Sequence, residues 1–299
     1  MKSIFSLSRK PWSFTILILL AWIFSIILIS NLLFFVLNLD HISQIPQPWP
    51  PILSHILAIF VIAPFVLGFS GKKFSYRDFL SEIRLTRMKP FLQLFLLGLT
   101  CYLIIALSQA AGVLVFRLSQ GQSIDWSFIR YTFVLTRELP PQSDSWFQSI
   151  PSIFEEITFR GLVLAIFLRF YSKSKAILFS SIVFGLMHIL TIADGRPPVW
   201  SAGQVLWAAI LGIFYGYVTI KSNSLLPAMM VHYLSNLFVS AINGYIQNNA
   251  AVAMQAIYGV IFTFGIVPSL LMILWTRFFA NRWLISQKKE IKKTDEQTA

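Results

Sequence analysis

Long runs of apolar residues, separated by short polar segments, occupy most of the chain. The runs are about 20 residues long and do not alternate between apolar and polar positions, so they predict transmembrane helices rather than strands. A helix pairs its own backbone polar groups, as lipid requires. The pattern predicts an all-α membrane protein, a bundle of about eight transmembrane helices. The predicted spans cover residues 14–38, 51–69, 90–116, 147–170, 175–191, 202–220, 224–242 and 255–280.

Composition agrees with a lipid environment. Of the 299 residues, 56% are hydrophobic and 12% are charged, whereas soluble domains carry about 25% charged residues. The net charge of +12 would suggest nucleic acid in a soluble protein. Here Lys and Arg are expected to anchor cytoplasmic loops, so no nucleic-acid partner is predicted. The single cysteine, Cys101, excludes an internal disulfide and a cysteine-based metal site.

The distribution of basic residues predicts an orientation. With the N-terminus placed in the cytoplasm, 19 of the 24 Lys and Arg residues fall in inner segments and four in outer loops. Because cytoplasmic loops are enriched in Lys and Arg, this split predicts a multi-pass integral membrane protein with both termini cytoplasmic. The remaining basic residue, Arg160, lies inside a span.

Polar residues that lipid disfavours are concentrated in three spans. The fourth span contains Glu155, Glu156 and Arg160, the fifth contains His188, and the seventh contains His232 and Asn236. An ionisable residue in a span costs about 2.5–3.5 kcal/mol by insertion scales, so these residues are functional candidates. Glu156 and Arg160 are four apart and can pair on one helix face. Glu155, about 100° around the helix, is then free to face another group.

Estimated depth brings these residues to a common level. At a rise of about 1.5 Å per residue, Glu155 lies about 22 Å, His188 about 20 Å and Asn236 about 18 Å from the cytoplasmic ends of their helices. They therefore share a slab in the middle and outer half of the hydrocarbon core. A buried carboxylate, two histidines and an amide can activate water and hold an oxyanion. This combination predicts hydrolysis of an amide bond in a site shielded from lipid.

Structural interpretations of the same residues stay open. A lone buried histidine such as His55 is more often a satisfied core residue than a ligand. The Glu156–Arg160 pair fits a structural clamp as well as a functional site, and His232 fits an interhelical hydrogen bond of about 0.6 kcal/mol. Neither the zincin motif H-E-x-x-H nor G-x-S-x-G occurs. The combination, rather than any single residue, favours a site.

Three ordered motifs carry a resemblance to a known family. They are Glu-Glu-x-x-x-Arg, Phe-x-x-x-His and His-x-x-x-Asn, matched by Glu155, Glu156 and Arg160, by Phe184 and His188, and by His232 and Asn236. Over residues 145–245 the chain resembles the CPBP (Abi) family of intramembrane proteases, which includes the type II CAAX prenyl endopeptidase. The chain then divides into helices one to three with a long outer loop (1–144), a protease core (145–245), and a last helix with a basic cytoplasmic tail (246–299).

The resemblance implies roles for the six polar residues. Glu155 and His188 would activate water, and His232 and Asn236 would stabilise the oxyanion. Glu156 and Arg160 would orient the site. A divalent metal such as zinc, with Glu155, His188 and His232 as candidate ligands, and a metal-free mechanism are equally compatible with these residues. The implied location is the plasma membrane of a prokaryotic cell.

We therefore predict an intramembrane endopeptidase that hydrolyses a membrane-associated peptide or protein substrate, with the lipid bilayer as its environment. The alternative is a non-enzymatic member of the same family, either a bacteriocin self-immunity factor or a partner-binding scaffold. A proton-relay transporter is disfavoured because neither internal repeats nor broken helices are recognisable in the sequence. The sequence predicts neither the identity of the substrate nor an oligomeric state.

Overall fold

The computed structural model describes residues 10–41, 44–68, 75–123, 145–193, 195–238 and 250–284. All regular structure in these ranges is helical, and η denotes a π-helix except for the 3₁₀-helix η5. The first half contains α1 (Pro11–Val36), α2 (Trp49–Leu57), η3 (Ala58–Ile62), α3 (Ala63–Gly68), α4 (Tyr76–Glu82) and α5 (Phe91–Ser119). The second half begins with α7 (Ser145–Gln148), α8 (Pro151–Glu156), η4 (Ile157–Val163), α9 (Leu164–Leu168), α10 (Lys173–Met187) and η5 (His188–Ile192). It continues with α11 (Pro198–Ser222), α12 (Leu226–Phe238), α14 (Val252–Tyr258), η6 (Gly259–Thr263), α15 (Ile266–Phe279) and η7 (Ala280–Leu284).

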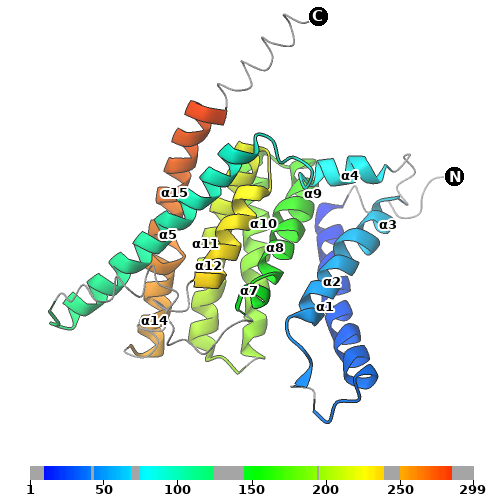
Figure 1. Cartoon of the computed structure of the whole chain (residues 1–299), viewed down its shortest axis with the longest axis horizontal. Coiled ribbons are helices and arrows are strands. Elements are labelled where there is room, and N and C mark those ends of the chain that lie inside the picture. Colours follow the sequence, from blue (N-terminus) through cyan, green and yellow to red (C-terminus); the bar gives the residue numbers. More distant parts are fainter. Residues whose placement is uncertain are drawn as a thin grey trace, which may run out of the picture.

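Successive helical runs cross the bundle in alternating directions (Figure 1). α1 and α2 lie side by side on one flank, and α5 packs against α15 on the other. α10 and α11 form the centre, and α12 packs against both α5 and α8. The start of α1 and the end of α15 lie toward the same end of the bundle (Figure 1). This arrangement places the second half of the chain around α11.

Six helical runs among the described residues are long and apolar enough to cross a membrane. They are Pro11–Val36, Trp49–Val66, Phe91–Ser119, Lys173–Ile192, Pro198–Ser222 and Val252–Trp283. These runs match six of the predicted spans and support a multi-pass membrane protein. The predicted spans 147–170 and 224–242 are not among the six. The first of them contains four charged residues and the second has only 13 residues in α12, so the count of about eight stays a prediction.

Prolines and glycines explain where helices begin and how closely they pack. α1, α2, α8 and α11 each have a proline in the first turn, where the missing N–H would have no helical partner. Gly185 of α10 faces α11 so closely that a Cβ would lie 2.6 Å from the carbonyl oxygen of Val205 and 2.7 Å from Cβ of Ala209. Small residues at such crossings let two helix backbones approach each other. Gly185 therefore lets α10 and α11 approach each other closely.

α1 has the exposure expected of a lipid-facing helix. Its buried side contributes Phe14 and Ile18 to a cluster with Ile59 and Ile166. Its other side leaves Phe24 65% and Leu32 58% exposed. Apolar side chains with such large exposed fractions are not covered by other described residues, and lipid is the solvent expected around them.

Candidate active site

A buried network joins the first and third sequence motifs. Arg160 Nη1 donates to Glu156 Oε1 at 3.1 Å, across one helical turn. His232 of α12 contacts the same carboxylate oxygen through Nδ1 at 2.8 Å. Glu156 and Arg160 are both fully buried, so each needs the other's charge to offset its desolvation. The predicted pairing of Glu156 with Arg160 is thus confirmed, and His232 completes it.

Aromatic rings enclose the guanidinium of Arg160. Its Cζ lies 4.0 Å from the ring centroid of Phe184 and 4.9 Å from that of Tyr215. Such faces attract a cation, more strongly when water is excluded. The Tyr215 ring also stacks on His232, with centroids 5.3 Å apart. The phenylalanine of the second motif and Tyr215 therefore support the buried charges from two sides.

The glycine at position 212 makes room for this cation. A Cβ there would lie 3.0 Å from Arg160 Nη2 and 3.0 Å from Cβ of Ser181. Neither distance leaves space for a methyl group without movement of the guanidinium or of α10. Gly212 of α11 is therefore part of the pocket that holds Arg160.

The helix that carries the two glutamates changes its winding directly after them. α8 ends at Glu156, and residues 157–163 form the π-helix η4 before α9 begins. All seven residues of η4 are buried. π-helical turns are rare and occur often at functional sites. The change in winding sets the direction of Arg160 relative to Glu156, which an ideal helical spacing does not describe.

Glu155 takes the second face of the same helix, as predicted. Its Oε2 lies 3.8 Å from His232 Nε2, and its side chain is 26% exposed. The His232 ring thus stands between two carboxylates, Glu156 at Nδ1 and Glu155 at Nε2. The buried carboxylate fixes the ring, while the partly exposed one remains open to water.

His188 approaches from α10. Its Nδ1 lies 3.0 Å from the carbonyl oxygen of Phe184, so the N–H at this position is donated to the backbone. In a neutral ring Nε2 then carries the lone pair. Phe184 packs edge-on against both His188 and His232, with centroids 4.8 Å and 5.9 Å away. Glu155 and His188 are near enough to interact electrostatically.

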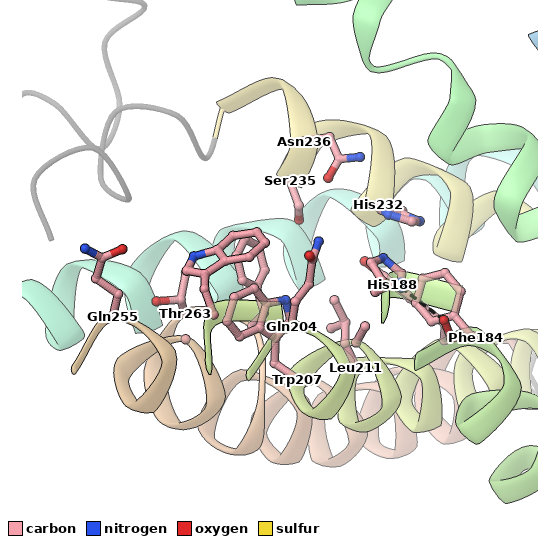
Figure 2. A pocket seen from close by; sticks show the side chains of 15 residues that line it. Phe184, His188, Gln204, Trp207, Leu211, His232, Ser235, Asn236, Gln255 and Thr263 are labelled. Carbon is pink, nitrogen blue, oxygen red and sulfur yellow. Dashed lines mark hydrogen bonds between the residues drawn. The ribbon is translucent and has the colours of Figure 1, made fainter. Parts of the chain in front are cut away.

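A cavity of about 220 Å³ opens beside these groups. His188, His232 and Asn236 are among its lining residues, and Figure 2 shows them at one end of it. Asn236 lies one turn after His232 on α12 and is exposed. Glu155, Glu156 and Arg160 lie behind or beside the cavity rather than in its lining. The structure therefore brings together the histidines and the asparagine in one open space.

The comparison with protein families agrees with this geometry. Residues 146–238 match the family model described as type II CAAX prenyl endopeptidase Rce1-like. This segment is similar to that family. It contains all six predicted site residues, and it confirms the family resemblance derived from the three motifs. No curated protein matches the chain, and no solved structure does.

The donor set does not fit a metal centre. Among the described residues, no group of three His, Cys, Asp or Glu side chains is arranged to hold a metal ion. The candidates Glu155, His188 and His232 all lie in those residues. Phe184 and Glu156 hold only Nδ1 of the two histidines, as is usual for metal-binding histidines, but the two Nε2 atoms and the Glu155 carboxylate do not converge on one point. A zinc site needs three or four protein ligands within about 2.3 Å of one point.

The cavity extends beyond the Rce1-like segment. Its remaining lining residues are Trp200, Gln204, Trp207, Ala208, Leu211, Tyr215, Ser235, Gln255, Gly259, Thr263 and Phe264. The last four come from α14, η6 and the turn that follows them. The sequence motifs indicated none of these. Only Gln204, a polar residue inside an apolar span, carried a signal that could have been noticed.

His55 lies in the core, as the structural interpretation described, but it is only half satisfied, because its Nε2 is buried without a hydrogen-bond partner. It is buried in α2, and its Nδ1 lies 3.0 Å from the hydroxyl oxygen of Thr158 in η4. Its ring stacks on Trp22 at 4.7 Å and on Phe154 at 6.3 Å. His55 therefore ties α1 and α2 to the helix that carries Glu155, and it does not line the cavity.

Proposed function

We propose that the protein is an intramembrane endopeptidase that hydrolyses a peptide bond of a membrane-associated protein or peptide. The observation that carries the proposal is the placement of His232 between a buried and a partly exposed carboxylate, at 2.8 Å from Glu156 and 3.8 Å from Glu155. This arrangement holds one ring nitrogen and leaves the other beside a water-accessible base. The family match supports a protease at the family level.

Glu155 is the proposed general base. Its exposure lets water reach the carboxylate, which can take one proton as the water oxygen attacks the scissile carbonyl carbon. His188 shares the proton transfer, because its Nε2 lone pair can accept the proton and return it to the leaving nitrogen. The bond between carbon and that nitrogen then breaks, and a carboxylic acid and an amine are released.

Asn236 and His232 are the proposed donors to the oxyanion. The amide nitrogen of Asn236 can donate directly. The Nδ1–H of His232 is donated to Glu156, so its Nε2 donates only when the ring is an imidazolium. Glu156 and Arg160 act through His232 by holding its ring in place. They are positioning residues in this proposal.

The first test replaces the base. Glu155→Gln keeps the size of the side chain but cannot accept the proton, and we expect cleavage of membrane-anchored peptides to fall by about 100-fold or more. Mass spectrometry of peptides incubated with the purified protein in bilayers gives the readout. Glu82→Gln is the matched control, because Glu82 forms an exposed ion pair with Arg169 outside the site.

Undiminished cleavage by Glu155→Gln would show that Glu155 is not the base. The non-enzymatic alternative makes a different prediction. If the protein is a self-immunity factor or scaffold, a Glu155→Gln, His188→Ala variant still protects cells in which the wild type protects. Loss of both cleavage and protection in that variant supports the protease.

A further inference from the structure

Three of the residues that line the cavity carry a buried polar atom without a hydrogen-bond partner, namely Gln204, Tyr215 and Ser235. The Tyr215 ring is already packed against Arg160 and His232, so the other two are considered as a pair. Gln204 Oε1 and Ser235 Oγ are both shielded from solvent, and neither forms a hydrogen bond with any described residue. Gln204 belongs to α11 and Ser235 to α12, and both line the cavity. Figure 2 shows the Ser235 hydroxyl and the Gln204 amide pointing toward each other across it.

Ser235 differs from three other helical serines in the same bundle, although Ser269 of α15 also lacks a partner. Ser181 and Ser222 each donate to the carbonyl oxygen four residues earlier, at 2.7 Å. Ser25 does the same at 2.6 Å. This local bond is the usual way to satisfy a helical hydroxyl in an apolar setting. Ser235 is 1% exposed and makes no such bond, so its hydroxyl is free for a group that enters the cavity.

The lining next to this pair is mainly apolar, and the two histidines of the lining, His188 and His232, lie toward one end of the cavity. The lining contains no Asp, Glu, Lys or Arg, and Trp207, Leu211 and Phe264 supply apolar surface beside the two polar atoms. A charged group placed here would lack a counter-charge. A neutral group with one donor and one acceptor would satisfy both sides. The main-chain peptide unit has this composition, because each carries one N–H and one C=O.

We propose that Gln204 and Ser235 form a subsite that binds a main-chain peptide group of the substrate near the scissile bond. The Gln204 amide accepts from the peptide N–H, and the Ser235 hydroxyl donates to the peptide C=O. Ser235 precedes Asn236 on α12, so a peptide group bound here lies in the same cavity as the oxyanion donor. This inference rests on the proposed peptidase function, and it names main-chain atoms, rather than a side chain, as the feature recognised.

The proposal is tested with a substrate peptide that the wild type cleaves. Each main-chain N–H near the cleaved bond is replaced in turn by an ester oxygen, which removes one donor. We expect one replacement to lower kcat/KM by about five- to tenfold in the wild type, the effect of one hydrogen bond. In Gln204→Leu the unmodified peptide shows the same loss, and the same ester causes no further loss.

Gln255→Leu is the matched control. Gln255 lines the same cavity, but its side-chain nitrogen already donates to the carbonyl oxygen of Ala250 at 2.9 Å. In this variant the ester penalty stays at its wild-type size. Ser235→Ala gives an independent check, because it should remove the penalty for modifying the peptide carbonyl. Neither Gln204→Leu nor Ser235→Ala is expected to change the melting temperature, since no protein partner is lost.

If the ester lowers kcat/KM in Gln204→Leu by the same factor as in the wild type, the subsite is overturned, while the peptidase function stays intact. Failure of the peptidase function has a separate signature, namely no Glu155-dependent cleavage of any peptide. The subsite is then decided by binding. The probes are membrane-anchored peptides of neutral residues with acetylated and amidated ends. The Glu155→Gln protein should retain them, and the double variant Glu155→Gln, Gln204→Leu should not. Equal retention by both proteins, or none by either, contradicts the proposal.

Discussion

Glu156 connects two other polar residues of the candidate site through one carboxylate oxygen. Its single oxygen Oε1 contacts both Arg160 and His232. The adjacent Glu155 differs by one position in sequence, yet it is 26% exposed, and its contact is with His232 at 3.8 Å rather than with a guanidinium. Desolvation is therefore severe for Glu156 and modest for Glu155. The same residue type serves structure at one position and, in our proposal, proton transfer at the next.

This contrast predicts different costs for the same substitution. Glu156→Gln leaves Arg160 as an unpaired buried charge, so we expect a loss of about 3–5 kcal/mol of stability. Glu155→Gln should cost much less, because its side chain is partly solvated. Thermal unfolding in detergent measures both. Adding Arg160→Met to Glu156→Gln should recover part of the loss, and a double variant less stable than Glu156→Gln alone would refute the ion-pair explanation.

Helix packing controls the site as much as its polar residues do. α11 runs through the centre of the bundle, packs against α10, and supplies Gly212, Tyr215 and Gln204 to the site or its cavity. η4 changes the winding of the helix that carries Arg160. These features hold the guanidinium between Phe184 and Tyr215. A methyl group in the wrong place on α11 should therefore disturb activity.

Two glycines of α11 allow a matched comparison. A Cβ at Gly212 meets Arg160 and the backbone of Ser181 at 3.0–3.1 Å, whereas one at Gly216 meets only the side chain of Ile177, at 3.1 Å. A side chain can rotate away, but a buried guanidinium and a backbone cannot do so cheaply. We expect Gly212→Ala to cost about 1–3 kcal/mol of stability and to lower cleavage more than Gly216→Ala does. Equal effects of the two substitutions would contradict this packing account.

The complete bundle encloses the site with parts of the chain that the family match does not include. α14 and η6 follow the Rce1-like segment and close one side of the cavity with Gln255 and Thr263. α1 and α2 lie on the opposite flank and reach the site helix through His55. The described fold therefore combines the segment that matches the family model with a cavity wall from the C-terminal helices and a supporting contact from the N-terminal ones.

The arrangement of donors in the bundle also predicts how cleavage responds to chelators. Because the described residues provide no group of three metal-binding side chains, we expect cleavage to survive dialysis against EDTA and 1,10-phenanthroline with less than about a twofold change. Metal analysis of the same preparation, by mass spectrometry, accompanies the assay. Loss of activity that stoichiometric Zn²⁺ restores would show that the site rearranges to bind a metal.

Much of the site could be predicted from sequence because its signals are local. The apolar runs gave the helical class, and six of the predicted spans are long and apolar enough to cross a membrane. The i,i+4 spacing predicted the Glu156–Arg160 pair, which the structure shows at 3.1 Å. The two predicted spans outside those six, 147–170 and 224–242, both carry residues of the polar site. Charged residues in the first and the short helix in the second weaken the membrane signal. The orientation of the termini stays a prediction.

What only the tertiary structure decided are contacts between residues far apart in the chain. The bond from His232 to Glu156 joins positions 76 residues apart, and no helical periodicity specifies it. The same holds for the stacking of Tyr215 on His232 and for the cavity wall formed by Gln204 and Ser235. Sequence determines which helix face is polar, since that depends on neighbouring residues. The packing of all the helices decides which of these polar faces contact each other. The same packing leaves Ser235 Oγ and Gln204 Oε1 without protein partners.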